Sequence, residues 1–355
     1  MRALIYVSFL VSILAAVPGR ACTCFSVALG DAVWVGRNYD WDFSDALVLV
    51  NPRGLEKFAN RDPNTSSRRW IARHGSVTFN QYGRDFPCGG MNEKGLVVEV
   101  LWLEGTVYPP EDERMGLDTV QWVQYQLDTA ASVDEVVGSL DRVRVQGEVA
   151  IHFFVADGDG SAAAIEFLDG KAVVHRSGRS MPYTALTNHT YEESLAYLQD
   201  LERRGDPEQL PKSTSSLPRF ARAATAARAL EKNVRAVQPA DIFRILGNVK
   251  QQGRTQWSIV YDVAGSRIHF RTQKQSGIKS IDLGNLDFAC TAPVRMIDVD
   301  LAAAGDVQSR WREYTRAANR DLIGRTFAKT EFLRTTAPQS LDDLAAHPER
   351  GGCAR

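Results

Sequence analysis

Two cysteines near the start of the sequence, Cys22 and Cys24, are the first residues whose type could do chemistry. They stand directly behind residues 19–21 (GRA), which offer small residues at the −3 and −1 positions of a signal peptidase site. If the chain is cleaved there, Cys22 becomes the first residue of the mature protein. A thiol in that position has a base of its own, because a free α-amine has a pKa of about 7.7–8.0 and lies within reach of the side-chain proton.

This pairing of thiol and amine predicts nucleophilic catalysis on a carbonyl group. The thiolate attacks the carbonyl carbon, the protonated amine gives its proton to the leaving nitrogen, and water then hydrolyses the acyl-enzyme. Arg37 would favour the thiolate in this scheme, and Asp40 would orient the amine. Both follow a hairpin signal, Gly30-Asp31 between two apolar runs, so the chain should return to its own start.

The turn of this hairpin decides which residues face each other. A two-residue loop at 30–31 pairs residues whose numbers sum to 61, which places Cys24 opposite Arg37 and Cys22 near Tyr39. A loop at 29–30 would place Cys22 opposite Arg37 instead. Either register brings residues 37–40 to the proposed nucleophile.

The residues before Cys22 predict a signal peptide over 1–21. Arg2 is a basic n-region, and the apolar h-region at 4–17 is shorter than the roughly 20 residues of a membrane span. We therefore expect a periplasmic or secreted protein with no membrane span. A lipoprotein signal also ends at a cysteine, which would be acylated, but Gly19 and Arg20 depart from that pattern.

Composition narrows the remaining function classes. The 42 basic and 43 acidic residues nearly cancel, so nothing indicates a nucleic-acid partner. The six histidines show no metal-binding spacing, and we expect no metal and no cofactor. Five cysteines leave one unpaired even if four form disulfides, and we interpret Cys24 and Cys88 as buried free thiols.

The apolar pattern predicts an α+β protein with layered sheets and helices outside. We expect one domain over 22–335 with a C-terminal extension at 336–355. Beyond the hairpin, the predicted strands are 47–51, 76–81, 95–102, 149–156, 162–167, 171–175, 182–187, 256–262, 266–272 and 279–283. The predicted helices are 117–129, one that begins at the capping box of Ser132, 191–203, 217–233 and 239–248.

Several sequence blocks, in this order and spacing, resemble the choloylglycine hydrolase family of linear-amide C–N hydrolases, which are N-terminal-nucleophile hydrolases. The resemblance covers most of the predicted mature chain. The blocks are 22-CTCFSVALGDAVWVGRNYDWD-42, 76-SVTFNQYGRDFPCGGMNEKGLVVEVLW-102, 183-YTALTNHTY-191, 217-LPRFARA-223 and 256-QWSIVYDVAGSRIHFRT-272.

The resemblance implies a four-layer αββα sandwich and hydrolysis of a small-molecule N-acyl amide. It also allows a homotetramer, since relatives are often tetramers. In this family Cys22 would be the nucleophile, Arg37 and Asp40 its partners, and two asparagines would form the oxyanion hole. The six site residues implied in this way are Cys22, Arg37, Asp40, Asn92, Asn188 and Arg219.

Other interpretations of these residues stay open. Asn92 precedes Glu-Lys-Gly and also suits a hairpin turn. A protein with an acylated or structural Cys22 would be a lipid-anchored or free periplasmic binding protein rather than an enzyme. A papain-like protease is disfavoured because its local signature surrounds neither early cysteine.

Overall fold

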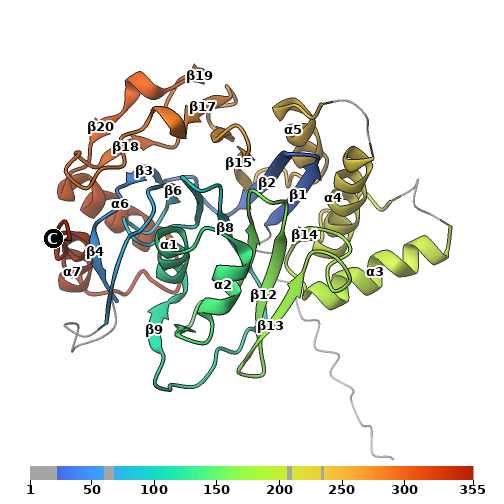
Figure 1. Ribbon diagram of the computed structural model, residues 1–355, viewed down its shortest axis with the longest axis horizontal. Helices are drawn as coiled ribbons and strands as arrows, with labels where there is room; N and C mark the ends of the chain where they lie inside the picture. Colours follow the sequence, from blue (N-terminus) through green and yellow to red (C-terminus); the bar gives the residue numbers. More distant parts are fainter. Residues whose placement is uncertain (1–21, 60–67, 206–209, 233–235, 355) are drawn as a thin grey trace, which may run out of the picture.

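The computed structural model describes residues 22–59, 68–205, 210–232 and 236–354. The predicted signal peptide, residues 1–21, lies outside these ranges. Two large sheets form the centre of the molecule, and helices cover them (Figure 1).

The first sheet contains the beginning of the described chain in its second strand, beside a short edge strand. Its seven strands, in spatial order, are β14 (Ala185–Leu186), β1 (Thr23–Leu29), β2 (Ala32–Asp40), β15 (Thr255–Asp262), β16 (Arg267–Thr272), β17 (Lys279–Asp282) and β19 (Gly305–Asp306). The predicted hairpin is confirmed as β1–β2, with Cys24 opposite Arg37. Gly30 has a φ of 59°, the left-handed conformation that glycine adopts readily and that this tight turn needs.

The second sheet has nine strands. In spatial order these are β13 (Lys171–Arg176), β12 (Ala162–Leu168), β11 (Ile151–Ala156), β8 (Val97–Trp102), β7 (Gly89–Asn92), β6 (Ser76–Asn80), β3 (Leu47–Asn51), β18 (Arg295–Asp298) and β20 (Arg312–Glu313). Two small two-stranded sheets complete the β-structure: β4 (Glu56–Phe58) with β5 (Arg69–Ile71), and β9 (Met115–Asp118) with β10 (Val143–Gln146).

The two large sheets pack face to face through aromatic side chains. Phe79 of β6 contacts Trp257 of β15 and Phe270 of β16, with ring centroids 6.2 and 5.3 Å apart. Helices α4 and α5 contact the first sheet, and α1 contacts the second. The predicted αββα order of layers is therefore confirmed. The helices are α1 (Thr119–Thr129), α2 (Val133–Ser139), α3 (Tyr191–Arg203), α4 (Ser216–Glu231), α5 (Pro239–Asn248), α6 (Arg316–Lys329) and α7 (Pro338–Ala346).

The periodic elements were predictable, and the short ones were not. Ser132 caps α2 as predicted, by accepting a hydrogen bond from the Glu135 backbone. The strand predicted at 182–187 shrinks to two residues, Ala185–Leu186. Strands β4, β5, β9, β10, β18, β19 and β20 have two to four residues each, too few for a clear alternation of polar and apolar side chains.

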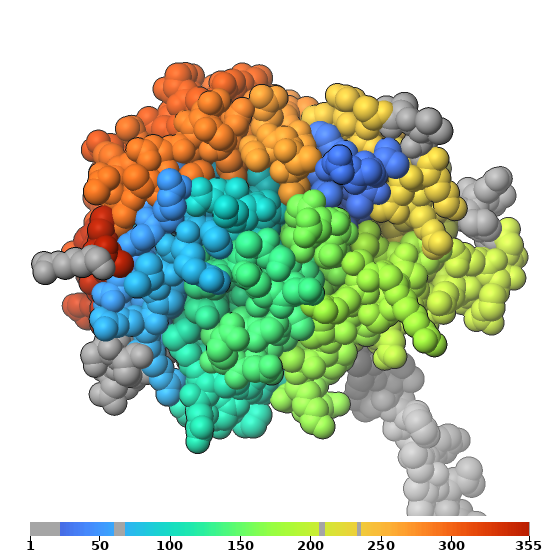
Figure 2. All heavy atoms as spheres, in the orientation of Figure 1, coloured from blue at the N-terminus to red at the C-terminus, as the bar shows by residue number. Residues whose placement is uncertain are grey.

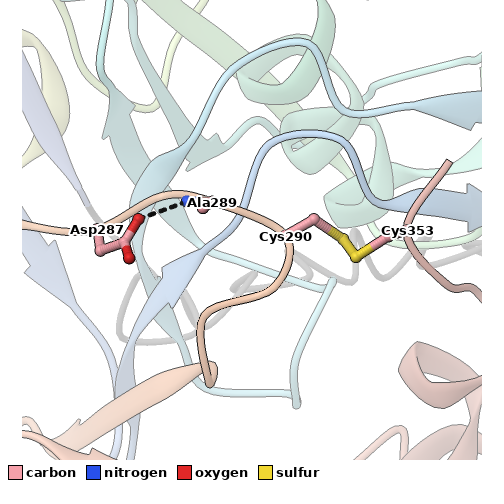
Figure 3. Close-up of a disulfide and its surroundings, with 4 residues drawn as sticks. All are labelled: Asp287, Ala289, Cys290 and Cys353. Carbon is pink, nitrogen blue, oxygen red and sulfur yellow. Dashed lines mark hydrogen bonds between the residues drawn. A yellow bond between two sulfur atoms is a disulfide. The ribbon is translucent and has the colours of Figure 1, made fainter. Parts of the chain in front are cut away.

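The C-terminal residues are packed onto the domain. Helices α6 and α7 contact each other and lie at the opposite end of the molecule from α3 (Figure 1). Leu55 forms a β-bridge with Cys353, and Figure 2 shows the red C-terminal residues beside the blue segment that contains β4. A disulfide joins Cys353 to Cys290 (Figure 3). The other three cysteines are free and buried, as expected for Cys24 and Cys88.

Replacing Cys353 with alanine should lower the melting temperature of the protein. The disulfide links residues 63 positions apart, and removing such a link costs about 2–5 kcal/mol of stability. Calorimetry of the variant and of the reduced wild type should give the same lowered value, because the described chain has no other disulfide. Equal melting temperatures for the oxidised wild type and the variant would contradict the expectation.

Candidate active site

Cys22 stands at the entrance to the central strand β1 and lines a cavity of about 900 Å³. Its side chain is buried, whereas Cys24, two residues along the strand, has no exposed surface and does not line the cavity. The residues that surround the cavity are mostly apolar or aromatic. The lining includes Tyr39, Asp40 and Trp41, at the end of β2 or just after it, and Val100, Leu101 and Trp102 on β8. Of the two early thiols, only that of Cys22 lines this cavity, where a small molecule could meet it; Cys88 also lines the cavity.

Arg37 brings a buried positive charge to the thiol. Its Nε lies 2.9 Å from a carboxylate oxygen of Glu99 on β8, so this ion pair joins the two sheets. Burial raises the pKa of Glu99 to about 7, although Arg37 and a hydrogen bond from Tyr261 favour its charged form. The contacts with the two early thiols and Glu99 hold the pKa of Arg37 well above its ordinary value. Arg37 therefore stays charged at the site.

The Cys22 thiol is held mainly in its neutral form. Burial raises its pKa, which Arg37 and the backbone N–H of Asp40 oppose by favouring the thiolate. The Asp40 carboxylate raises the pKa further by charge repulsion. After burial, the main influences on the pKa of this thiol come from Arg37 and Asp40, and no histidine is among them. A base that takes the proton during attack must come from elsewhere.

Asn188 and Arg219 hold the backbone of Cys22. The Cys22 backbone nitrogen donates to Asn188 Oδ1 at 2.8 Å. Arg219, on α4, donates to the Cys22 carbonyl at 2.7 Å and to the same Asn188 oxygen at 2.8 Å. It also donates to Thr23 Oγ1, while Asn188 Nδ2 donates to the Trp102 carbonyl. These bonds fix the position of the Cys22 nitrogen.

Asp40 lies at the end of β2, beside the same cavity. Burial raises the pKa of its carboxyl group, and the Arg219 guanidinium is the strongest opposing influence. Thr255 donates to one carboxylate oxygen and Gln251 to the other. The structure therefore brings five of the six predicted site residues together: Cys22, Arg37, Asp40, Asn188 and Arg219.

Asn92 is the exception. It does not line the cavity, and both polar atoms of its side chain make hydrogen bonds elsewhere. Its Nδ2 donates to the carbonyls of Leu127 and Ala130, and its Oδ1 accepts from the backbone of Lys94 and Leu96. The Asn92 side chain closes the β7–β8 turn and anchors it to the end of α1, as the hairpin interpretation allowed, and the oxyanion-hole role of Asn92 stays a prediction.

Four other residues shape the site without having been predicted. Glu99 pairs with Arg37, Thr255 and Gln251 hold Asp40, and the Trp102 carbonyl holds Asn188. Glu99 was detectable, because a charged residue in the middle of the apolar strand VVEVLW indicates a buried partner. Thr255 and Gln251 carry no comparable signal, since their role depends on where β15 lies beside β2.

A buried cluster of polar groups supports the segment that presents Asn188. His152 on β11 contacts the Thr187 carbonyl at 2.7 Å through Nε2 and Glu166 at 3.0 Å through Nδ1. Although burial favours the neutral acid, hydrogen bonds from His152 and His175 lower the pKa of Glu166 to about 2. Glu166 therefore stays ionised and keeps His152 oriented towards residue 187.

Among the residues that the structure describes, no group of three or more histidine, cysteine, aspartate or glutamate side chains could hold a metal ion. Within the same ranges, no helix combines the length and apolar character that crossing a membrane would require.

Helices outside, two stacked sheets inside and a thiol at the entrance to a central strand define the fold class of the N-terminal-nucleophile hydrolases. The profile of the linear amide C–N hydrolases, choloylglycine hydrolase family, matches residues 22–296. The chain belongs to this family, and its relatives hydrolyse C–N bonds in linear amides.

Two relatives and two solved structures illustrate the match. The chain is 28% identical over 296 residues to the penicillin V acylase of Pectobacterium atrosepticum. The aligned region covers 71% of this chain and 77% of the relative. It is 23% identical over 294 residues to the bile salt hydrolase/transferase of Bifidobacterium longum, with 72% and 92% covered.

The penicillin V acylase structure from Agrobacterium tumefaciens has a TM-score of 0.73 and 29% identity, with 83% of this chain and 98% of that chain covered. A variant of the conjugated bile acid hydrolase from Clostridium perfringens has a TM-score of 0.66 at 18% identity, with 80% and 98% covered, and shares the fold. The predicted family and fold are confirmed.

Replacing Glu166 with glutamine should weaken the fall in the free energy of unfolding as the pH is lowered from 4.5 to 2. The carboxyl pKa is about 2 in the folded protein against 4.5 as the ordinary value, so its stabilisation is complete above pH 4.5 and is lost as the pH falls through 2. The difference corresponds to about 3 kcal/mol. Urea unfolding between pH 7 and 2 measures it. Glu192→Gln, at an exposed carboxylate on α3, is the control, and parallel curves for Glu166→Gln and the wild type would contradict the assignment.

Proposed function

We propose that the protein is an exported amidase that hydrolyses the linear amide bond of N-acyl compounds, with Cys22 as an N-terminal nucleophile. The observation that carries the proposal is the convergence of Arg37, Asp40, Asn188 and Arg219 on a buried thiol that lines a largely apolar cavity. The export signal at 1–21 is part of the proposal, because its removal creates the α-amine that the chemistry needs.

In the first half-reaction, the Cys22 sulfur attacks the amide carbon while its proton moves to the α-amine. Asn188 Oδ1 orients this nitrogen, since it already accepts a hydrogen bond from it at 2.8 Å. Arg37 stabilises the negative charge on sulfur as it develops. The tetrahedral intermediate then collapses: the C–N bond breaks, and the ammonium returns its proton to the leaving amine.

In the second half-reaction, the α-amine takes a proton from water, which attacks the thioester carbon. The C–S bond breaks, the acid is released, and the thiol recovers its proton. Asn188 remains the proposed donor to the oxyanion. Its Nδ2 carries two protons, of which the Trp102 carbonyl takes one. Asp40 and Arg219 act by fixing the geometry around the nucleophile.

The substrate class proposed is an amide with an apolar acyl group. A cavity of about 900 Å³ lined largely by apolar side chains favours burial of hydrocarbon rather than of a charged amine. Relatives are named for penicillin V and for bile salts.

Cys22→Ser should remove nearly all amide hydrolysis and leave the fold intact, because a hydroxyl is a far weaker nucleophile than a thiol. Cys24→Ser should keep most of the activity, since Cys24 is fully buried and does not line the cavity. Steady-state hydrolysis of a panel of N-acyl amides measures both variants. The opposite outcome, with Cys24 essential and Cys22 dispensable, would overturn the choice of nucleophile and of cleavage site.

A protein in which an unremovable Met-Gly replaces the leader should fold and be inert. Its Cys22 nitrogen is an amide, which has no usable basicity near neutral pH and cannot take the thiol proton. The matched protein has only an initiator methionine, which is trimmed to expose Cys22, and it should be active. Intact mass confirms both N-termini and would also reveal a lipid adduct in the exported protein. Equal rates from the two forms would show that the α-amine is not the base.

A further inference from the structure

The cavity next to Cys22 is completed by residues near the C-terminus. We call residues 327–350 the C-terminal wall, because ten of the residues that line the cavity lie within it. The family profile ends at residue 296, so the wall lies outside the matched region. The part of the chain expected to be an extension, 336–355, thus supplies lining residues such as Leu344, Ala346 and His347.

The C-terminal wall runs along one side of the cavity. Its Phe332 ring lies 6.5 Å from the ring of Trp102, whose carbonyl holds Asn188. Its His347 ring lies 5.8 Å from the ring of Phe86, another lining residue. The cavity that Cys22 lines is therefore bounded in part by the wall.

Polar contacts and the disulfide hold the wall against the domain. Lys329, at the end of α6, donates to a carboxylate oxygen of Asp45 at 2.7 Å. His347 Nε2 lies 2.9 Å from the Phe58 carbonyl. The disulfide between Cys290 and Cys353 fastens the chain just beyond the wall (Figure 3). Fastening at several points makes the wall a rigid boundary rather than a loose tail.

We propose that the C-terminal wall sets the length of acyl group that the enzyme accepts. The proposal rests on the proposed function, with the acyl chain in the cavity. Leu344 and Ala346 line the cavity near the end of α7, and both are only partly buried, so a change in side-chain size there changes the space available to a ligand. Each methylene buried on binding is worth about a fourfold gain in kcat/KM.

The test compares three variants on a series of p-nitroanilides from butanoyl to dodecanoyl. Ala346→Trp fills the cavity and should lower kcat/KM for dodecanoyl relative to butanoyl by at least about tenfold, the value of roughly two methylenes. Leu344→Ala enlarges it and should shift the ratio the other way. Gln339→Trp, at an exposed position of α7 that does not line the cavity, is the control and should leave the ratio as in the wild type.

Two outcomes would overturn the proposal. One is a dodecanoyl-to-butanoyl ratio that neither Ala346→Trp nor Leu344→Ala changes, in a wild type that distinguishes the two chains. The other would appear in a second series, butanoyl amides of increasingly large amines, as an effect of Ala346→Trp on kcat/KM that follows the size of the leaving amine, with no effect of the acyl chain length in the anilide series. If Ala346→Trp fails to fold, the dodecanoyl-to-butanoyl ratio of Leu344→Ala alone decides the test.

Failure of the proposed function would look different. If the wild type hydrolyses none of the anilides, calorimetric binding of dodecanoate to Cys22→Ala tests the wall without any turnover. Weaker binding when Ala346→Trp is added to this protein supports the wall as the boundary of the acyl site. Equal binding with and without the tryptophan overturns it.

Discussion

A guanidinium with no exposed surface must find its partners inside the protein, and Arg37 finds them between the two sheets. Glu99 supplies the countercharge from the opposite sheet, and the carbonyl of Val100 accepts a further hydrogen bond. An unpaired buried charge would cost several kcal/mol, so the pair constrains how β2 and β8 face each other. The same constraint explains Gly89, because a side chain there would occupy the place of the Glu99 carboxylate. The site therefore begins with an electrostatic requirement of the core.

Cys22 lies between two buried arginines that come from different layers. Arg37 approaches the Cys22 thiol from the neighbouring strand, and Arg219 reaches the Cys22 carbonyl from α4. Burial lowers the pKa of Arg219, which Asp40 opposes, so one carboxylate supports the second cation as well as the site. Displacing either sheet or α4 would separate Arg37 from Glu99 or Arg219 from Asp40. Stability and geometry of the site consequently depend on the same contacts, and the fold has to deliver both at once.

Local rules predicted what depends on neighbours in the sequence. The Gly30-Asp31 signal predicted the hairpin and left two registers open, and the structure has the one with Cys24 opposite Arg37. Position within a motif that resembles the family was a weaker guide. The Asn92 side chain bonds the carbonyls at the end of α1, and only the packing of α1 against β7 reveals this. The contributions of Thr255 and of the C-terminal wall arise from contacts between residues more than 200 positions apart in the chain. Periodicity carries no information about such contacts.

The raised pKa of the Cys22 thiol means that the thiol is neutral in the resting site. A thiol that stood ionised beside Arg37 would react with oxidants and electrophiles whether or not substrate was present. Burial prevents this by favouring the neutral form, and Arg37 alone does not reverse the effect. Ionisation must then coincide with attack, which requires a base within reach of the sulfur. As the α-amine proposed for the mature protein, the nitrogen of the same residue would meet this condition without any additional side chain. Asn188 accepts a hydrogen bond from that nitrogen. In the proposed mechanism, the position of Cys22 at the chain's start thus keeps the resting thiol inert and makes it reactive when a carbonyl arrives.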